Sequence, residues 1–198
     1  MSLPFGLRPT LEIVQLGDPV LRAQAADWPG GAVDASIAEL IEAMRDTMHA
    51  APGVGLAAPQ IGVSLRLAVI EDLWPVDPEN AAVREREPLE FLAVLNPRYT
   101  PIGTRTAMHY EGCLSMEGYT AAVERPADIL ASWISPDGQA HERELHGWQA
   151  RIFQHETDHL DGTLYIDKAL TRSLCTSENY GRMWADPAPD AARVHLGF

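Results

Sequence analysis

The chain has 198 residues, 46% hydrophobic and 22% charged, a composition ordinary for one globular domain. Its formal net charge is −13, with acidic residues spread along the chain, which argues against broad binding to nucleic acids or anionic membranes. No apolar run approaches the roughly 18 residues that cross a bilayer, and residues 1–22 lack a basic segment followed by an apolar one, so we expect a soluble, unexported protein.

The first regular element that the sequence predicts is an amphipathic helix over residues 33–50. Its apolar residues recur at helical spacing: Ile37, Leu40, Ile41, Met44 and Met48. Ser36 with Glu39 resembles a capping box at the start, and Pro52 with Gly53 ends the helix.

Short apolar runs after this helix predict strands. They are Arg66–Glu71, Phe91–Asn96, Thr120–Glu124 and Asp128–Ile134. The last run is followed by the turn "SPDG" and a polar run to Leu145, which favours a hairpin. Residues 72–90 form a charged, proline-bearing connection between the first two runs, of a length that is usually functional or mobile.

A second helix is expected to begin near Gly147 and to stop at Gly162. Trp148, Ile152, His155 and His159 are spaced four, three and four residues apart, so they share one face of this helix. Helix, several strands and helix follow one another without regular alternation, which predicts the α+β class. The tail beyond Lys168 has no predicted place.

The stretch "FQHETDHLDG" in the second helix has the pattern H-E-x-x-H. Residues four apart on a helix lie about 6 Å apart along its axis, so His155 and His159 can bind one metal ion. Glu156 points about 100° away around the helix, which suits a group that works beside the metal. Two polar residues that merely share a helix face are the alternative, but buried imidazoles need hydrogen-bond partners or a metal.

A catalytic metal site needs three protein ligands and an open position, so a third ligand must come from elsewhere in the chain. The candidates are Cys113, the carboxylates and the remaining histidines at positions 49, 109, 141, 146 and 195. Cys113 lies in "YEGCLS", where Gly112 permits tight backbone geometry and Glu111 is close enough to orient a ligand; a thiolate suits zinc or ferrous iron. Spacing does not select among these candidates.

The stretch "PGVGLAAPQIG", residues 52–62, is a second unusual segment. Gly53 and Gly55 allow the backbone to approach a ligand closely, and Gln60 needs a partner if it is buried. A lone glycine pattern of this kind also fits a plain turn from a helix into a strand.

Three segments together resemble the three motifs of peptide deformylases, in the same order and at similar separations. They are "GVGLAAPQ" (53–60), "EGCLS" (111–115) and "QHETDHLDG" (154–162). The resemblance covers about residues 11–170. It implies antiparallel strands packed around a central helix that carries the H-E-x-x-H motif, with residues 1–170 as the catalytic domain and residues 171–198 as an extension of it.

The resemblance also implies a role for each matching residue. Cys113, His155 and His159 would bind the metal, and Glu156 would be the general base and acid. Gln60 and the backbone N–H of Leu114 would hold the carbonyl oxygen. Gly55 would bind the substrate backbone, and an apolar pocket for the methionine side chain has these candidates: Val54, Trp148 and Ile152.

By the same resemblance the protein is a metal-dependent hydrolase that removes the N-formyl group from the N-terminal methionine of new polypeptides in the bacterial cytoplasm. One divalent ion is implied, Fe(II) in the cell and Zn(II), Ni(II) or Co(II) in purified protein. The expected partners are N-formylmethionyl peptides and, transiently, the ribosome; no sequence-specific nucleic-acid binding and no membrane are expected.

Two alternatives to an active deformylase remain at this stage. A conventional zinc metalloprotease shares H-E-x-x-H but leaves "EGCLS" and "GVGLAAPQ" without a role. A catalytically silent homologue that binds metal or formyl peptides would need neither Glu156 nor Gln60. The chain also departs from the family after "EGCLS": it has Met116, Glu117 and Thr120 where an aliphatic residue, proline and arginine are usual, which concerns peptide contacts and not the metal.

Overall fold

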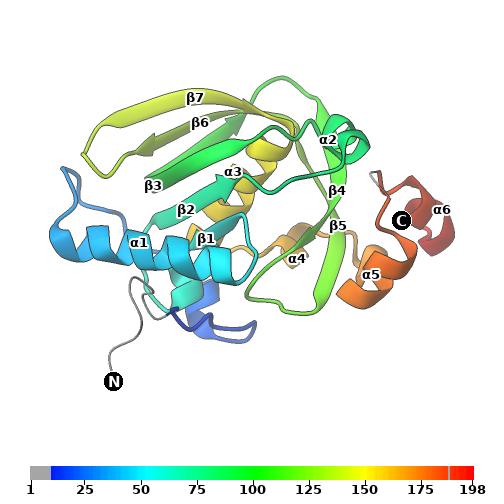
Figure 1. Cartoon of the computed structure of the whole chain (residues 1–198), viewed down its shortest axis with the longest axis horizontal. Coiled ribbons are helices and arrows are strands. Elements are labelled where there is room, and N and C mark those ends of the chain that lie inside the picture. The colour runs from blue at the N-terminus through cyan, green and yellow to red at the C-terminus, as the bar shows by residue number, and fades with distance from the viewer. Residues whose placement is uncertain (1–9, 187) are drawn as a thin grey trace.

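The structure is a computed structural model that describes residues 10–186 and 188–198. Two antiparallel sheets and several helices make up these residues, which confirms the expected α+β class (Figure 1). One sheet has the order β1-β2-β3-β6-β7 and the other β4-β5-β8. The strands are β1 Gly55–Ala57, β2 Leu67–Asp72, β3 Leu89–Pro101, β4 Thr106–Gly112, β5 Tyr119–Pro126, β6 Asp128–Ile134, β7 Ala140–His146 and β8 Cys175–Thr176.

The α-helices are α1 Ala35–Ala50, α2 Pro78–Arg84, α3 Gly147–Leu160, α4 Tyr165–Lys168, α5 Ser177–Met183 and α6 Asp190–Leu196. Three short 3₁₀ helices span Pro19–Arg22, Ala58–Ile61 and Thr171–Ser173. The N-cap of α1 is Asp34, whose carboxylate accepts hydrogen bonds from the N–H groups of Ser36 and Ile37. The N-cap is therefore two residues before Ser36, where the capping box was expected.

All four expected strands exist, and the expected hairpin is β6 paired with β7, from Asp128 opposite His146 to Ile134 opposite Ala140. Sequence reasoning missed β4, the three-residue β1 and the helix α2 inside the connection 72–90. β4 was missed because alternation is obscured in "TAMHYEG", where the polar His109 and Glu111 are buried.

The helix α3 lies against the five-stranded sheet (Figure 1). Its apolar residues Ile152, Phe153 and Leu160 belong to the buried cluster that also contains Ile129 and Trp133 of β6. Gly147 begins the helix with φ +51, and a Cβ there would come within 2.4 Å of the Cβ of Glu85. This close approach sets α2 directly against the start of α3.

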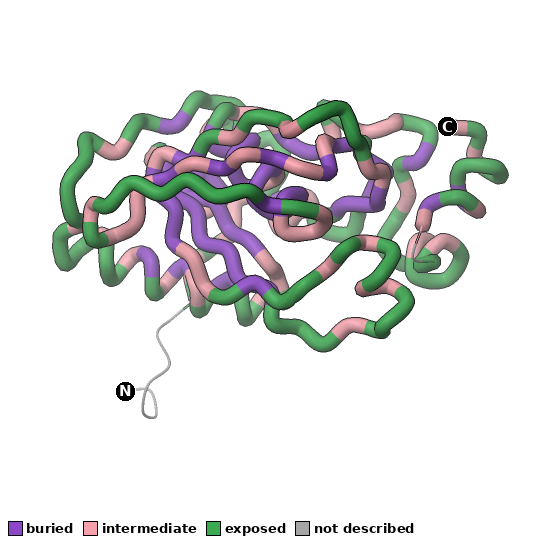
Figure 2. The backbone as a smooth tube through the Cα atoms, turned by 90° about the horizontal axis from the view of Figure 1, so that it is seen from above, coloured by how far each residue is buried: buried purple, intermediate pink, exposed green. Residues whose placement is uncertain are grey.

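The C-terminal segment packs on the second sheet. Its strand β8 pairs with β5, Tyr119 opposite Thr176 and Thr120 opposite Cys175, so α5 and α6 lie at the far end of the molecule from α1 (Figure 1). Figure 2 shows the buried residues gathered in the middle of the molecule, whereas the C-terminal end is mostly exposed or half-buried.

Helices in the described ranges 10–186 and 188–198 include none that is long and apolar enough to cross a membrane. The start of the expected N-terminal region, residues 1–9, and residue 187 of the expected extension lie outside the described residues.

Candidate metal centre

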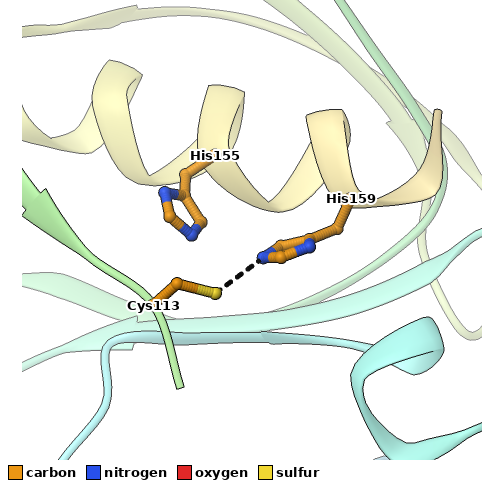
Figure 3. A group of neighbouring side chains, drawn as sticks. All are labelled: Cys113, His155 and His159. Atoms are coloured by element: carbon orange, nitrogen blue, oxygen red, sulfur yellow. Dashed lines mark hydrogen bonds between the residues drawn. The ribbon is translucent and has the colours of Figure 1, made fainter. Parts of the chain in front are cut away.

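Two of the three sequence motifs meet where β4 ends beside α3. Cys113 directly follows β4, and α3 carries His155 and His159 one turn apart. Figure 3 shows the three side chains pointing toward one another. One ligand atom from each lies within 4.8 Å of the other two, and the Cys113 Sγ is 3.3 Å from the His159 Nε2.

This donor set fits a divalent metal. Zinc–ligand bonds of about 2.0 to 2.3 Å place the ligand atoms of one tetrahedral site roughly 3 to 4 Å apart, close to the spacing found. Burial lowers the pKa of His159 well below its usual range, so its ring is neutral, as a metal ligand must be. Thiolate and imidazole ligands suit zinc and ferrous iron among other ions.

The remaining histidines lie away from this cluster, each with another neighbour. His49 pairs with Glu71, His109 meets the edge of Trp148, His141 stacks on Trp133, His146 contacts Asp128 and His195 faces Trp184. The geometry thus selects Cys113 from the candidates that spacing left open.

Glu111, the last residue but one of β4, orients the first histidine. Its Oε2 is 2.9 Å from the His155 Nδ1, which leaves the other ring nitrogen to face Cys113 and His159 (Figure 3). Burial alone would raise the pKa of Glu111, but Arg125, His155 and Arg151 hold it well below its usual range. Glu111 is therefore an ionised carboxylate inside the protein.

Two buried arginines balance that charge, and sequence reasoning found neither. Arg125 on β5 donates from Nε and Nη2 to the two oxygens of Glu111 at 2.7 and 3.0 Å, and from Nη1 to Asp158 at 2.7 Å. Arg151 on α3 also donates to Glu111 and to the carbonyls of Val123 and Ala107. Arginines at inward-facing positions of a strand and a helix could have indicated a buried ion pair, because a buried charge needs a partner.

Glu156 is buried next to the ligands on α3. Burial raises its pKa to about 7, with His155 and Arg125 opposing part of that rise. A Cβ on Gly55 would come within 2.2 Å of the Glu156 Oε1, so the first motif's glycine makes room for this carboxylate. The Oε2 atom is buried without a hydrogen-bond partner among the described residues, as expected for a group whose partner is a ligand or water.

Gln60 has a fixed amide orientation beside Cys113. Its Oε1 accepts from the Ala57 N–H at 2.8 Å, while its Nε2 donates to the Ser115 Oγ at 3.2 Å and lies 3.5 Å from the Cys113 Sγ. The two Nε2 hydrogens are therefore donated to these two acceptors. In the described part of the chain the backbone N–H of Leu114 has no acceptor, so this donor is available beside the cluster.

A cavity of about 960 Å³ opens over the cluster. It brings together nine of the ten site residues predicted from sequence: Val54, Gly55, Gln60, Cys113, Leu114, Trp148, Ile152, His155 and Glu156. His159 lies beneath, as the third member of the metal group. The departures at Met116, Glu117 and Thr120 all line this cavity, as do Arg84, Tyr110, Ser177 and Tyr180, which sequence reasoning did not single out.

The fold and this site define a class: an α+β protein with one Cys/His/His metal site and a buried carboxylate at the edge of a cavity large enough for a peptide. A family model described as polypeptide deformylase matches residues 10–173. The chain belongs to this family. It is an enzyme that removes the N-formyl group from nascent polypeptides and depends on a metal to do so.

Curated relatives and solved structures agree with the assignment. The chain is 51% identical to a peptide deformylase of Bifidobacterium adolescentis over 98% of this chain and 88% of that one. It is 50% identical to peptide deformylase 3 of Streptomyces avermitilis over 95% and 84% of the two chains. A class I type b peptide deformylase of Acinetobacter baumannii with Met-Ala-Ser bound superposes with a TM-score of 0.74 at 27% identity, covering 82% of this chain and 99% of that chain.

Proposed function

We propose that Cys113, His155 and His159 bind the catalytic metal of this deformylase and that Glu156 is its general base and acid. The observation that carries the proposal is the convergence of these three ligands next to the cavity that Cys113, His155 and the buried Glu156 line. We propose Fe(II) as the ion in the cell, with Zn(II), Ni(II) or Co(II) in purified protein.

The chain's own groups each take one part of the reaction. A divalent ion, when bound, polarises the formyl carbonyl and activates a water molecule. Glu156, with a pKa of about 7, accepts a proton from the attacking water and returns it to the amine that leaves as methionine's N-terminus. Gln60 and the Leu114 N–H donate to the carbonyl oxygen as negative charge develops there, a contribution of about 3 to 4 kcal/mol per donor.

The substrate is proposed to lie along β1 with its methionine side chain in an apolar pocket. Gly55 presents its backbone to the cavity without a side chain in the way. Val54, Trp148 and Ile152 line the same cavity and supply apolar surface. The carbonyl carbon of a formyl group bears a hydrogen where other acyl groups have a carbon substituent, so a close fit around it excludes larger acyl groups.

The remaining expectations are proposals of the same kind. We propose that the enzyme works in the cytoplasm of a bacterium and meets its substrates through transient ribosome contact. Residues 171–198 are proposed to extend the catalytic domain, which the pairing of β8 with β5 and the packing of Tyr180 on Tyr110 support.

The experiment is an assay of anaerobically purified, Fe(II)- or Ni(II)-loaded protein on formyl-Met-Ala-Ser that follows the freed amine. Glu156→Ala should lower kcat by about 10²- to 10⁴-fold with one metal still bound per chain. Arg143→Ala, at an exposed position on β7, is the matched control and should behave as the parent protein. Absence of deformylation by metal-replete parent protein would instead support a catalytically silent homologue.

A further inference from the structure

The arginine side chain of Arg84 lines the cavity beside Trp148, which is on the first turn of α3. Arg84, the last residue of α2, lines the cavity, and its Cζ lies 5.0 Å from the centroid of the Trp148 ring. Trp148 precedes His155 by seven residues on α3, so these two residues lie about 10 Å apart along the helix axis, and Arg84 lies beside the Trp148 ring.

Arg84 lacks the ion pair that its neighbours have. Arg86 makes a two-pronged pair with Asp72, with both contacts at 2.7 Å, and Glu85 accepts from Arg105 at 2.5 and 3.0 Å. Within residues 10–186 and 188–198, no carboxylate lies within 4.0 Å of the Arg84 guanidinium, and its Nε is buried without a hydrogen-bond partner. A half-buried cation left in this state favours binding of an anion.

The position of Arg84 is fixed from three sides. Its Nη2 donates to the hydroxyl of Tyr180 on α5 at 3.2 Å, and its guanidinium lies over Trp148. The next residue, Glu85, packs against Gly147 and accepts from the Trp148 N–H at 3.4 Å. Because the guanidinium is held in place before a ligand arrives, little side-chain entropy is lost when one binds.

The cavity is lined by two arginines, Arg84 and Arg151, and by three glutamates, Glu111, Glu117 and Glu156. The charge of Glu111 is balanced by Arg125 and Arg151. Arg151 donates hydrogen bonds to Glu111 and to the carbonyls of Val123 and Ala107. Thr120, where the family usually has arginine, donates its hydroxyl to the Glu111 carbonyl at 2.6 Å. Among the described residues that line the cavity, Arg84 is therefore the arginine without a carboxylate partner.

The distance matches a residue shortly after methionine. An extended peptide advances about 3.3 to 3.6 Å per residue, so a chain whose formyl group lies at the metal ligands brings its second or third residue about 10 Å away. Building on the proposed function, we propose that Arg84 is a specificity-determining residue that binds the side-chain carboxylate of an aspartate or glutamate at position two or three of the formyl-methionyl peptide.

The test compares isosteric peptides on one enzyme preparation. Metal-loaded protein is assayed on formyl-Met-Asp-Ser-amide against formyl-Met-Asn-Ser-amide, and on formyl-Met-Ala-Asp-amide against formyl-Met-Ala-Asn-amide; the terminal amide removes the competing carboxylate. At one of the two positions kcat/KM should favour Asp over Asn by about 5- to 10-fold, as expected for a charge-assisted hydrogen bond. Each ratio is independent of how much protein is folded and metal-loaded.

Arg84→Met, which keeps the long stem without the charge, should bring that ratio to about one, and Arg84→Lys should restore part of it. Arg143→Met, on exposed β7, is the matched control and should keep the parent ratio. Calorimetric binding of the product peptides Met-Asp-Ser-amide and Met-Asn-Ser-amide gives the same comparison without turnover.

Two results would overturn the inference. One is an Asp/Asn ratio of one or less at both positions in the parent protein; the other is a ratio that Arg84→Met leaves unchanged, which would make Arg84 a wall of the methionine pocket. Failure of the proposed function is a separate outcome, recognised because the Asn peptides too would not be hydrolysed.

Discussion

The two ends of the cavity differ in how deeply their residues are buried. At the metal end the polar groups are deeply buried and paired, with Glu111 5% and Arg125 2% exposed. At the outer end α2 and α5 contain no buried residue among those described, and Arg84 of α2 donates to the hydroxyl of Tyr180 of α5. The comparison teaches that burial and ion pairing constrain the residues at the metal end, whereas the residues of α2 and α5 at the outer end are less constrained by packing.

The strongest test of this contrast is the buried carboxylate. Glu111→Gln leaves Arg151 without its counter-charge and Arg125 with Asp158 alone, so we expect a loss of about 3 to 5 kcal/mol in the free energy of unfolding, measured by urea denaturation of metal-loaded protein. Metal affinity should also weaken by about 10- to 100-fold, because the carboxylate orients His155. Glu142→Gln, on the exposed face of β7, is the control; a loss below about 1 kcal/mol for Glu111→Gln would contradict the contrast.

A second test lies between the two ends, at His109. Burial, together with the charges of Arg151 and Arg84, lowers its pKa to about 4. Its pKa in the unfolded chain is about 6.5, so between these values the unfolded chain takes up a proton that the folded protein refuses, and stability falls as pH is lowered through that window.

Between pH 7 and pH 5 this histidine should account for a loss of about 1 to 2 kcal/mol. In His109→Phe, which keeps a ring against Trp148, the difference in unfolding free energy between the two pH values should shrink by that amount. Urea midpoints of both proteins at both pH values provide the measurement. An unchanged pH dependence would mean that the His109 proton is bound in the folded state as well.

The smallest effect is expected in the C-terminal segment. Trp184 belongs to the satellite cluster around Tyr110 and Ala192, separate from the main core. Trp184→Ala should cost about 1 kcal/mol and act locally, with faster amide hydrogen exchange in α5 and α6 and unchanged exchange in α3. Exchange that rises equally in α3 would show that this segment and the core unfold as one unit.

The sequence anticipated the metal end better than the outer end, for a physical reason. Helical periodicity predicted that His155 and His159 share one face of a helix, and a short apolar run followed by the turn "SPDG" predicted β6 and its hairpin partner β7. These are local patterns. The selection of Cys113, the pairing of Glu111 with Arg125 and the approach of Arg84 to Trp148 all join residues far apart in the chain, and no period or spacing encodes such contacts.

Gly147 forms a direct packing contact between the outer end of the cavity and the helix of the metal end. It has a backbone conformation that side chains rarely adopt, and its bare Cα lets the end of α2 rest on the first turn of the helix that carries both histidines. Any substitution that moves Glu85 toward α3 would therefore meet the first turn of that helix directly, because this close-packed contact leaves no free space. Substitutions at the outer end of the cavity are therefore limited by the contact between Gly147 and Glu85.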